Sequence, residues 1–284
     1  MALTIDIINN VRGLFKYKHW DLSNGEGKLF DNFCKRLEII PNLEDQKFII
    51  ELSRDFLCVE MVNVYENIQS VFFNISEDIY NRYDKITILP LSESICGNSQ
   101  KTKSGQAYFY FLKSSDFFTW FDYFPNKFQF SDIININYIH PKKALFLIDD
   151  YVGSGETVKD IFLKVKSLYP TIDPNNFYVL APYAQEAGIK YLKSEYNITV
   201  FTEVLRNKGI TDNYKKELVP LYVHKMENIE DLISPKIKQG GLSLGFKRGE
   251  ALIRLLNKTP NNTFPFYWFD TSTLQSPFPR RIKL

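Results

Sequence analysis

Two adjacent carboxylates followed by a run of small residues form the group best suited to chemistry in this sequence. The acids are Asp149 and Asp150, and the small residues after them are Gly153, Ser154, Gly155 and Thr157. Carboxylates accept hydrogen bonds from a diol and ligate Mg²⁺, while a glycine-rich turn lets main-chain N–H groups approach a phosphate closely. The pattern therefore predicts a site for a ribose 5-phosphate with Mg²⁺.

The elements around this group favour such a site. Residues 143–148 (KALFLI) form a continuous apolar run, typical of a strand buried on both faces of a parallel sheet. Val158, Ile161, Phe162 and Val165 then follow at helical spacing. The acids would lie at the carboxyl end of a strand, where open α/β sheets bind their ligands, and the small residues would open a helix whose N-terminus attracts anions.

Strands and helices alternate further along the chain. NFYVLAPY (176–183) and ITVFTEV (198–204) have strand character, and the segment between them (184–196) is predicted to be helical. Upstream, KITILPLSE (85–93) and QAYFYFLK (106–113) are predicted as strands on either side of a long polar loop. This order indicates an α/β core with a parallel sheet.

Other interpretations of the loop are weaker. A Walker loop requires GxxxxGK[ST], which the loop lacks, and a dinucleotide fingerprint requires a third glycine where Val158 stands. A purely structural alternative, in which the acids cap a helix and the glycines make a turn, remains open.

Residues 145–157 (LFLIDDYVGSGET) resemble the phosphoribosyl-diphosphate motif of the type I phosphoribosyltransferases. The resemblance implies that Asp149 and Asp150 contact the ribose hydroxyls and, through a Mg²⁺–ligand complex, the metal, while the small-residue loop holds the 5-phosphate. The family's pyrophosphate loop follows an earlier core strand, and the candidates here are Ser92, Glu93, Ser94, Lys101 and Lys103. The two lysines have an alternative role as ordinary solvated loop residues.

Glu156 departs from the family pattern, because this position is usually small. A carboxylate pointing into the loop would repel a phosphate. We expect Glu156 to turn outward as a first-turn helix acid, which the helix dipole favours. The alternative is a pocket for a sugar without the phosphate, which would make the ligand a nucleoside.

A second resemblance lies near the C-terminus. Residues 249–269 (GEALIRLLNKTPNNTFPFYWF) are similar to the end of a phosphoribosyltransferase-like branch found in prokaryotic conflict systems, including retron-type anti-phage loci. That branch implies partner proteins from a defence operon, such as a reverse transcriptase with its nucleic acid, or an ATPase. Candidates for base binding in this segment are Asn261, Asn262, Tyr267 and Trp268. The aromatic run has an alternative role as core.

Three regions are predicted. Residues 1–83 form a helical N-terminal subdomain that serves as a lid or docks a partner. Residues 84–228 form the phosphoribosyltransferase-like core. Residues 229–284 form a helical and aromatic extension that completes this core, with a helix over 249–258.

Composition narrows the function classes. The 284 residues carry a net charge of +2, too low for a general nucleic-acid coat. No apolar stretch is long enough to span a bilayer, the first residues lack a signal-peptide pattern, and three scattered cysteines suit a reducing compartment. We expect a cytoplasmic protein without a membrane partner or a structural zinc site, and a homodimer stays open.

The sequence thus predicts a Mg²⁺-dependent, phosphoribosyltransferase-like enzyme that acts at C1 of a ribose as an anti-phage effector. One alternative is a catalytically silent module that senses a nucleotide or ribose phosphate and signals to a partner. Another is a scaffold without a ligand.

Overall fold

The chain divides into two compact units. The computed structural model describes residues 2–22, 28–96, 104–114, 127–256 and 258–280. One unit combines residues 1–60 with residues 207–284, and the other is the continuous segment 61–206. We call them the helical unit and the α/β unit.

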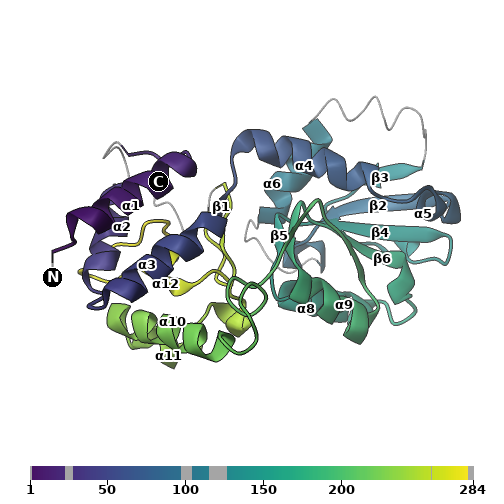
Figure 1. The fold of residues 1–284 in the computed structure, drawn as a ribbon. Coiled ribbons are helices and arrows are strands. Elements are labelled where there is room, and N and C mark those ends of the chain that lie inside the picture. Colours follow the sequence, from purple (N-terminus) through teal and green to yellow (C-terminus); the bar gives the residue numbers. More distant parts are fainter. Residues whose placement is uncertain (1, 23–27, 97–103, 115–126, 257, 281–284) are drawn as a thin grey trace. The chain divides into compact units, whose positions relative to one another are not determined.

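The α/β unit is built on a five-stranded sheet in which every neighbouring pair is parallel (Figure 1). The strand order is β3-β2-β4-β6-β8. The strands are β2 (Lys85–Pro90), β3 (Phe128–Phe130), β4 (Lys143–Ile148), β6 (Phe177–Leu180) and β8 (Thr199–Phe201). The α/β class with a parallel sheet, predicted from the alternating pattern, is confirmed.

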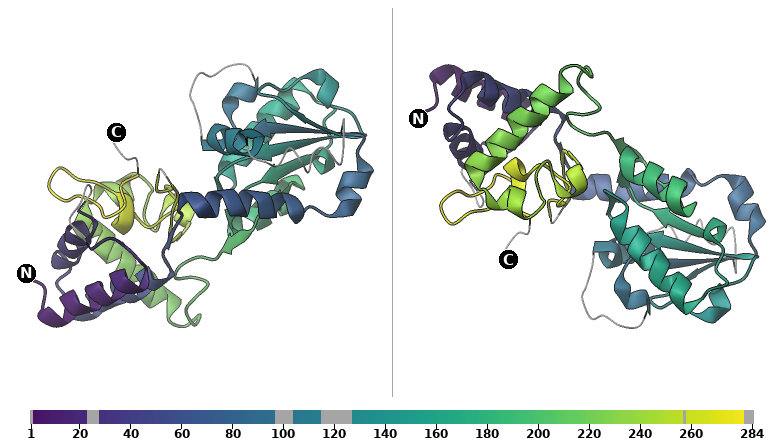
Figure 2. Two further views of the ribbon diagram at one scale, coloured as in Figure 1. Left: turned by 90° about the horizontal axis from the view of Figure 1, so that it is seen from above. Right: turned by 90° about the horizontal axis from the view of Figure 1, so that it is seen from below.

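Helices cover both faces of this sheet (Figures 1 and 2). On one face lie α8 (Glu156–Leu168) and α9 (Glu186–Tyr196), whose apolar side chains share a core with Leu145 and Leu147 of β4. On the other face lie α4 (Met61–Phe73) and α6 (Ser104–Ser114), and α5 (Glu77–Arg82) precedes β2. Burial of β4 on both faces explains its unbroken apolar sequence.

Three strands of the main sheet continue into a second, smaller parallel sheet. After a gap of two residues, β4 is followed by β5 (Tyr151–Val152), β6 by β7 (Tyr183–Gln185), and β8 by β9 (Val204–Arg206). These short strands pair in the order β5-β7-β9. The main sheet therefore ends along a common line, and Asp149 and Asp150 form the gap in the β4 path.

The helical unit brings the two ends of the chain together. Its helices are α1 (Ile5–Tyr17), α2 (Leu29–Glu38), α3 (Leu43–Leu52), α10 (Val219–Ile233), α11 (Lys236–Gln239) and α12 (Pro265–Trp268). Strand β1 (Leu57–Cys58) pairs in parallel with β10 (Ile253–Arg254). One apolar cluster joins Phe15 and Phe33 from the first helices to Phe266 and Tyr267 near the end. Short 3₁₀ helices occur in the chain at Ser53–Asp55, Glu93–Cys96, Ile136–Tyr138, Pro174–Asn176 and Phe246–Arg248.

Two predicted elements are wrong. The segment 106–113, predicted as a strand, lies within α6, because Tyr108, Phe109 and Leu112 follow the spacing of one buried helix face. The segment 249–258, predicted as a helix, contains β10. Its start is incompatible with a helix, since Glu250 adopts a left-handed φ of 51°.

The domain boundaries also differ from the prediction. The segment 229–284 packs with the first helices of the chain and does not complete the α/β core, since the aromatic run is buried against Phe33 and Phe56. The first boundary falls at residue 60 in place of 83, because α4 and α5 belong to the α/β unit. Among the described residues, none of the helices combines the length and apolarity that a bilayer crossing requires.

Candidate functional site

Asp149 and Asp150 lie where the path from β4 to β5 breaks. The Asp149 N–H donates to the Leu180 carbonyl oxygen (3.0 Å), and the Asp149 carboxylate accepts from the Asp150 N–H (2.9 Å). These bonds fix both acids at the carboxyl edge of the sheet. Both residues are buried, being only 8% and 2% exposed, and α6 begins against this edge, with Gly105 close to Ile148 and Leu91.

The glycine loop presents main-chain donors at the N-terminus of α8. Gly155 has φ of 82°, a left-handed conformation that glycine adopts without strain. Within the described part of the chain, the N–H groups of Gly153, Ser154, Gly155 and Thr157 donate to no other group. The next N–H along the loop, that of Glu156, donates to Ser154 Oγ (3.5 Å). Unpaired N–H groups at the positive end of a helix are suited to an anion.

Helix α9 holds the loop from one side. A Cβ atom at Gly188 would lie 2.0 Å from the Gly153 carbonyl oxygen, and a Cβ atom at Gly155 would lie 2.9 Å from Leu192 Cγ. Backbone packs on backbone here, so the loop conformation is set by α9 as well as by its own glycines.

Glu156 turns along the helix as expected. Its carboxylate pairs with Lys159 Nζ at 2.5 Å, one turn further on. This bond to Glu156 raises the pKa of Lys159. The Glu156 charge is thereby matched by a neighbouring cation, which reduces its repulsion of an anion in the loop.

The predicted pyrophosphate-loop residues follow the strand next to β4. Strands β2 and β4 pair directly, and the Leu91 N–H donates to the Ile148 carbonyl oxygen (2.7 Å). Ser92 is completely buried at this edge. Glu93 and Ser94 belong to a 3₁₀ helix that begins there. Lys101 and Lys103 lie outside the described residues.

The predicted base-binding residues belong to the other unit. Tyr267 Oη bonds Ser53 Oγ (2.8 Å), and Trp268 Nε1 donates to the Thr263 carbonyl oxygen (2.6 Å). Asn262 Nδ2 donates to the Phe246 carbonyl oxygen (3.1 Å). Asn261 holds the same loop, because its carbonyl oxygen accepts from the Phe246 N–H (2.7 Å). These side chains and backbone groups stabilise the helical unit, and the structure gives no support for a base contact.

Sequence reasoning missed a polar layer beside the acids. Tyr151 and Tyr183 are paired in register on β5 and β7, and Val152 and Ala184 on the opposite face join the apolar core under α8 and α9. Tyr183 Oη therefore faces α4, where Asn67 Nδ2 donates to it (2.9 Å). The signal in the sequence was the tyrosine that directly follows the break between β4 and β5 and the break between β6 and β7.

The acidic pair has the donor chemistry of a magnesium site. Mg²⁺ is commonly held by one or two carboxylates together with phosphate oxygens and water. Within the described ranges, three or more His, Cys, Asp or Glu side chains nowhere gather into a metal-binding group. The two acids thus fit Mg²⁺ that arrives with a phosphorylated ligand.

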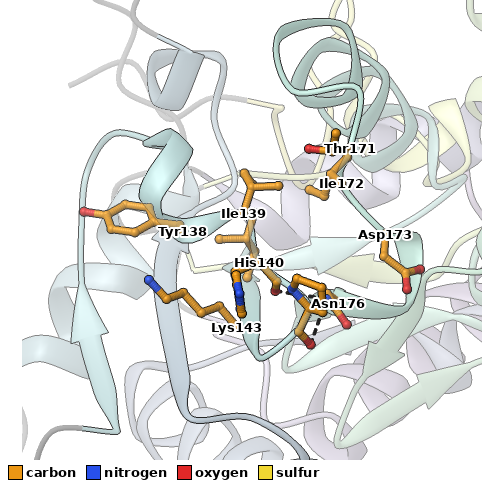
Figure 3. A pocket seen from close by; sticks show the side chains of 10 residues that line it. Tyr138, Ile139, His140, Lys143, Thr171, Ile172, Asp173 and Asn176 are labelled. Atoms are coloured by element: carbon orange, nitrogen blue, oxygen red, sulfur yellow. Dashed lines mark hydrogen bonds between the residues drawn. The ribbon is translucent and has the colours of Figure 1, made fainter.

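A cavity elsewhere in the α/β unit does not coincide with the acids (Figure 3). It has a volume of about 190 Å³ and lies beside Lys143, at the opposite end of β4. Its polar groups bond to one another or to the backbone: Lys143 Nζ donates to the Asn137 carbonyl oxygen (2.6 Å), and Asn176 Nδ2 donates to that of His140 (3.3 Å). The carboxylates of Asp149 and Asp150, together with the glycine loop, are therefore a stronger argument for a ligand site than this cavity is.

Comparisons with known proteins place the chain among phosphoribosyltransferase-type sequences. The family model PRTase-CE matches residues 23–280. No curated protein matches the chain. Similar solved structures include an orotate phosphoribosyltransferase from Aeropyrum pernix, which is 7% identical with a TM-score of 0.29 and aligns over 50% of this chain and 70% of its own.

Two further structures show a comparable likeness. The AQ2163 protein from Aquifex aeolicus is 9% identical over 66% of this chain and 86% of its own, with a TM-score of 0.31. The APRTase from Giardia lamblia, complexed with 9-deazaadenine, is 13% identical over 50% of this chain and 77% of its own, with a TM-score of 0.27.

Proposed function

Since the chain belongs to the PRTase-CE family, we propose that its glycine loop and acidic pair bind a phosphorylated pentose and that the protein transfers a phosphoribosyl group. The ligand would be phosphoribosyl diphosphate or a related ribose phosphate, bound with Mg²⁺. In this proposal the reaction makes or breaks a bond at C1 of the ribose.

One observation carries the proposal. Among the described residues, the N–H groups of residues 153–155 and 157 at the N-terminus of α8 have no hydrogen-bond acceptor, and two carboxylates lie two strand residues upstream. Such N–H groups bind a phosphate, and carboxylates accept hydrogen bonds from the hydroxyls of a vicinal diol. A pentose phosphate carries both groups at a fixed separation.

The acids would also act on the reaction itself. Departure of pyrophosphate from C1 leaves positive charge on the sugar ring, which nearby carboxylates stabilise. Their burial strengthens this effect, because Asp149 and Asp150 are largely removed from screening water. Mg²⁺, when bound, would neutralise the charge that builds on the leaving diphosphate.

Pyrophosphate release tests the catalytic part of the proposal. The full chain is incubated with phosphoribosyl diphosphate, Mg²⁺ and a panel of bases, with Asp149→Asn/Asp150→Asn as the control protein. We expect release by the wild-type chain that depends on an acceptor and is absent from the control. Saturable binding without release for every acceptor would instead identify a sensing module.

We further propose that this activity serves anti-phage defence in the cytoplasm, together with proteins of the same operon. The support is the resemblance of residues 249–269 to the prokaryotic conflict branch. In cells carrying the intact operon, the double Asp→Asn variant should lose protection against phage while its protein level stays constant. Full protection by the variant would separate any defence role from this site.

A further inference from the structure

Two buried tyrosine hydroxyls close to the acids in the structure or the sequence have no hydrogen-bond partner among the described residues: that of Tyr151, directly after Asp150, and that of Tyr108. Tyr108, on α6, is 5% exposed, and its Oη finds no hydrogen-bond partner among the described residues. Buried hydroxyls are nearly always bonded, because an unpaired one loses its water without compensation. An exception of this kind calls for an explanation.

Tyr108 belongs to a helix that begins against the strand ends next to the acidic pair. A Cβ atom at Gly105 would lie 2.6 Å from the Ile148 carbonyl oxygen and 3.0 Å from the Leu91 nitrogen, so the first turn of α6 rests on the ends of β4 and β2. Tyr108 follows one turn later. Burial, and then the nearby Asp150, Tyr183 and Asp149, raise the pKa of Tyr108.

The three side chains have complementary hydrogen-bonding capacity. Ionised carboxylates only accept hydrogen bonds, whereas each ribose hydroxyl both donates and accepts. A diol held by Asp149 and Asp150 therefore keeps free lone pairs that require a donor. The phenol of Tyr108 carries an O–H group and can serve as that donor.

We propose that Tyr108 is a further binding residue of this site and that its hydroxyl donates a hydrogen bond to the pentose held by Asp149 and Asp150. This inference rests on the proposed function. It explains why a buried hydroxyl is kept beside the acids without a partner in the chain: its partner arrives with the ligand.

Tyr108→Phe tests the inference, with Tyr80→Phe as the matched control. Tyr80 is equally buried (6% exposed), but its Oη donates to the Phe72 carbonyl oxygen (2.8 Å). The full chain, with Mg²⁺, is titrated calorimetrically with ribose 5-phosphate and with phosphoribosyl diphosphate, and the melting temperature of each unliganded protein is measured. We expect Tyr108→Phe to bind both ligands about 10-fold more weakly, with an unchanged or higher melting temperature. Tyr80→Phe should melt at a lower temperature and bind as the wild type does.

The outcomes separate the inference from the proposed function. No saturable binding by the wild-type chain overturns both. Wild-type binding with equal affinity in Tyr108→Phe overturns the inference alone, as does a loss confined to phosphoribosyl diphosphate, which would place the hydroxyl at the diphosphate. A fall in the melting temperature of unliganded Tyr108→Phe that matches Tyr80→Phe also overturns it, because the hydroxyl would then have an internal partner.

Discussion

Gly188 on α9 touches the backbone of Gly153 so closely that a Cβ atom would lie 2.0 Å from the Gly153 carbonyl oxygen. The clashing atom belongs to the backbone, so no change of side-chain conformation can relieve the clash. The geometry of the glycine loop therefore depends on a helix that follows it by 30 residues in the sequence.

Gly188→Ala should destabilise the protein and weaken ligand binding. Overpacking of this kind costs about 1–3 kcal/mol of unfolding free energy, and here it also displaces the loop. Gly13→Ala is the matched control, because Gly13 lies within α1 and a Cβ atom there meets nothing within 4 Å. The control should gain about 0.5–1 kcal/mol. Chemical denaturation measures both, and a neutral Gly188→Ala would show that the loop does not depend on α9.

Gly155→Ala tests the left-handed residue of the loop itself. A side chain at φ of 82° costs about 1–2 kcal/mol, and the new Cβ atom would also lie 2.9 Å from Leu192 Cγ. Gly241→Ala carries the conformational cost alone, since Gly241 has φ of 65° and open space around it. We expect Gly155→Ala to lose more unfolding free energy than Gly241→Ala. Equal losses would mean that Leu192 moves aside freely.

Glu230 should make stability depend on pH. Burial raises its pKa to about 8, although bonds from the Leu244 N–H and Ser243 Oγ favour the charged form. Because the pKa of Glu230 is higher in the folded state than in the unfolded state, proton binding by Glu230 stabilises the folded protein. This stabilisation is fully present below the unfolded-state pKa. It is lost as the pH rises through about 8, by at most ~1.4 kcal/mol per pH unit.

Glu230→Gln removes the titrating group, so the difference in unfolding free energy between variant and wild type isolates its effect. The wild type should lose stability relative to Glu230→Gln between about pH 4.5 and 8. Parallel stability curves over this range would contradict the raised pKa.

Arg36 holds the C-terminal segment to the first helices of the helical unit. It is fully buried, and its guanidinium donates to the carbonyl oxygens of Gln275 (3.1 Å), Leu274 (3.2 Å) and Phe269. Burial lowers the pKa of Arg36 to about 10. Arg36→Met would remove the donor to the Gln275 and Phe269 oxygens, whereas the Leu274 oxygen would keep its bond from the Thr271 N–H (3.1 Å).

We expect Arg36→Met to lose about 3–5 kcal/mol of unfolding free energy and to expose the segment around Leu274 to proteolysis. Arg54→Met is the control, because the Arg54 side chain is 52% exposed, pairs with Glu51 at the surface and lies over the Tyr17 ring (5.9 Å). Such exposed pairs contribute about 1 kcal/mol or less. Equal losses in the two variants would contradict a holding role for Arg36.

Local patterns predicted the part of the fold around the site. The apolar run 143–148 is β4 with the predicted bounds, and the helical spacing from Val158 identifies α8. Both signals come from neighbouring residues. A strand buried on both faces has a continuous apolar sequence, and a helix buried on one face has apolar residues at helical spacing.

Contacts between distant residues were not predicted. The aromatic alternation of 106–113 favoured a strand, but the segment is helical, and Tyr108, Phe109 and Leu112 lie on its buried face. Residues 253–254 extend because they pair with β1, almost 200 positions earlier in the chain. The partner of a strand or an apolar face is set by the fold, and so the helical unit, with Phe266 and Tyr267 against the first helices, could not be derived locally.

For the site itself, the sequence identified the acids and the glycine loop. It did not identify Tyr108, because the segment 106–113 was predicted to be a strand. Burial of Asp149 and Asp150 also escaped prediction.

Calorimetric titration of the full chain with phosphoribosyl diphosphate and Mg²⁺, in parallel with Asp149→Asn/Asp150→Asn, tests the pentose-phosphate site most directly. We predict saturable binding by the wild type and a loss of affinity of at least about 100-fold in the double variant, with an unchanged circular dichroism spectrum, because each charged hydrogen bond contributes about 1.5–3 kcal/mol. Binding of equal affinity by the two folded proteins, or no binding by the wild type, would contradict the account.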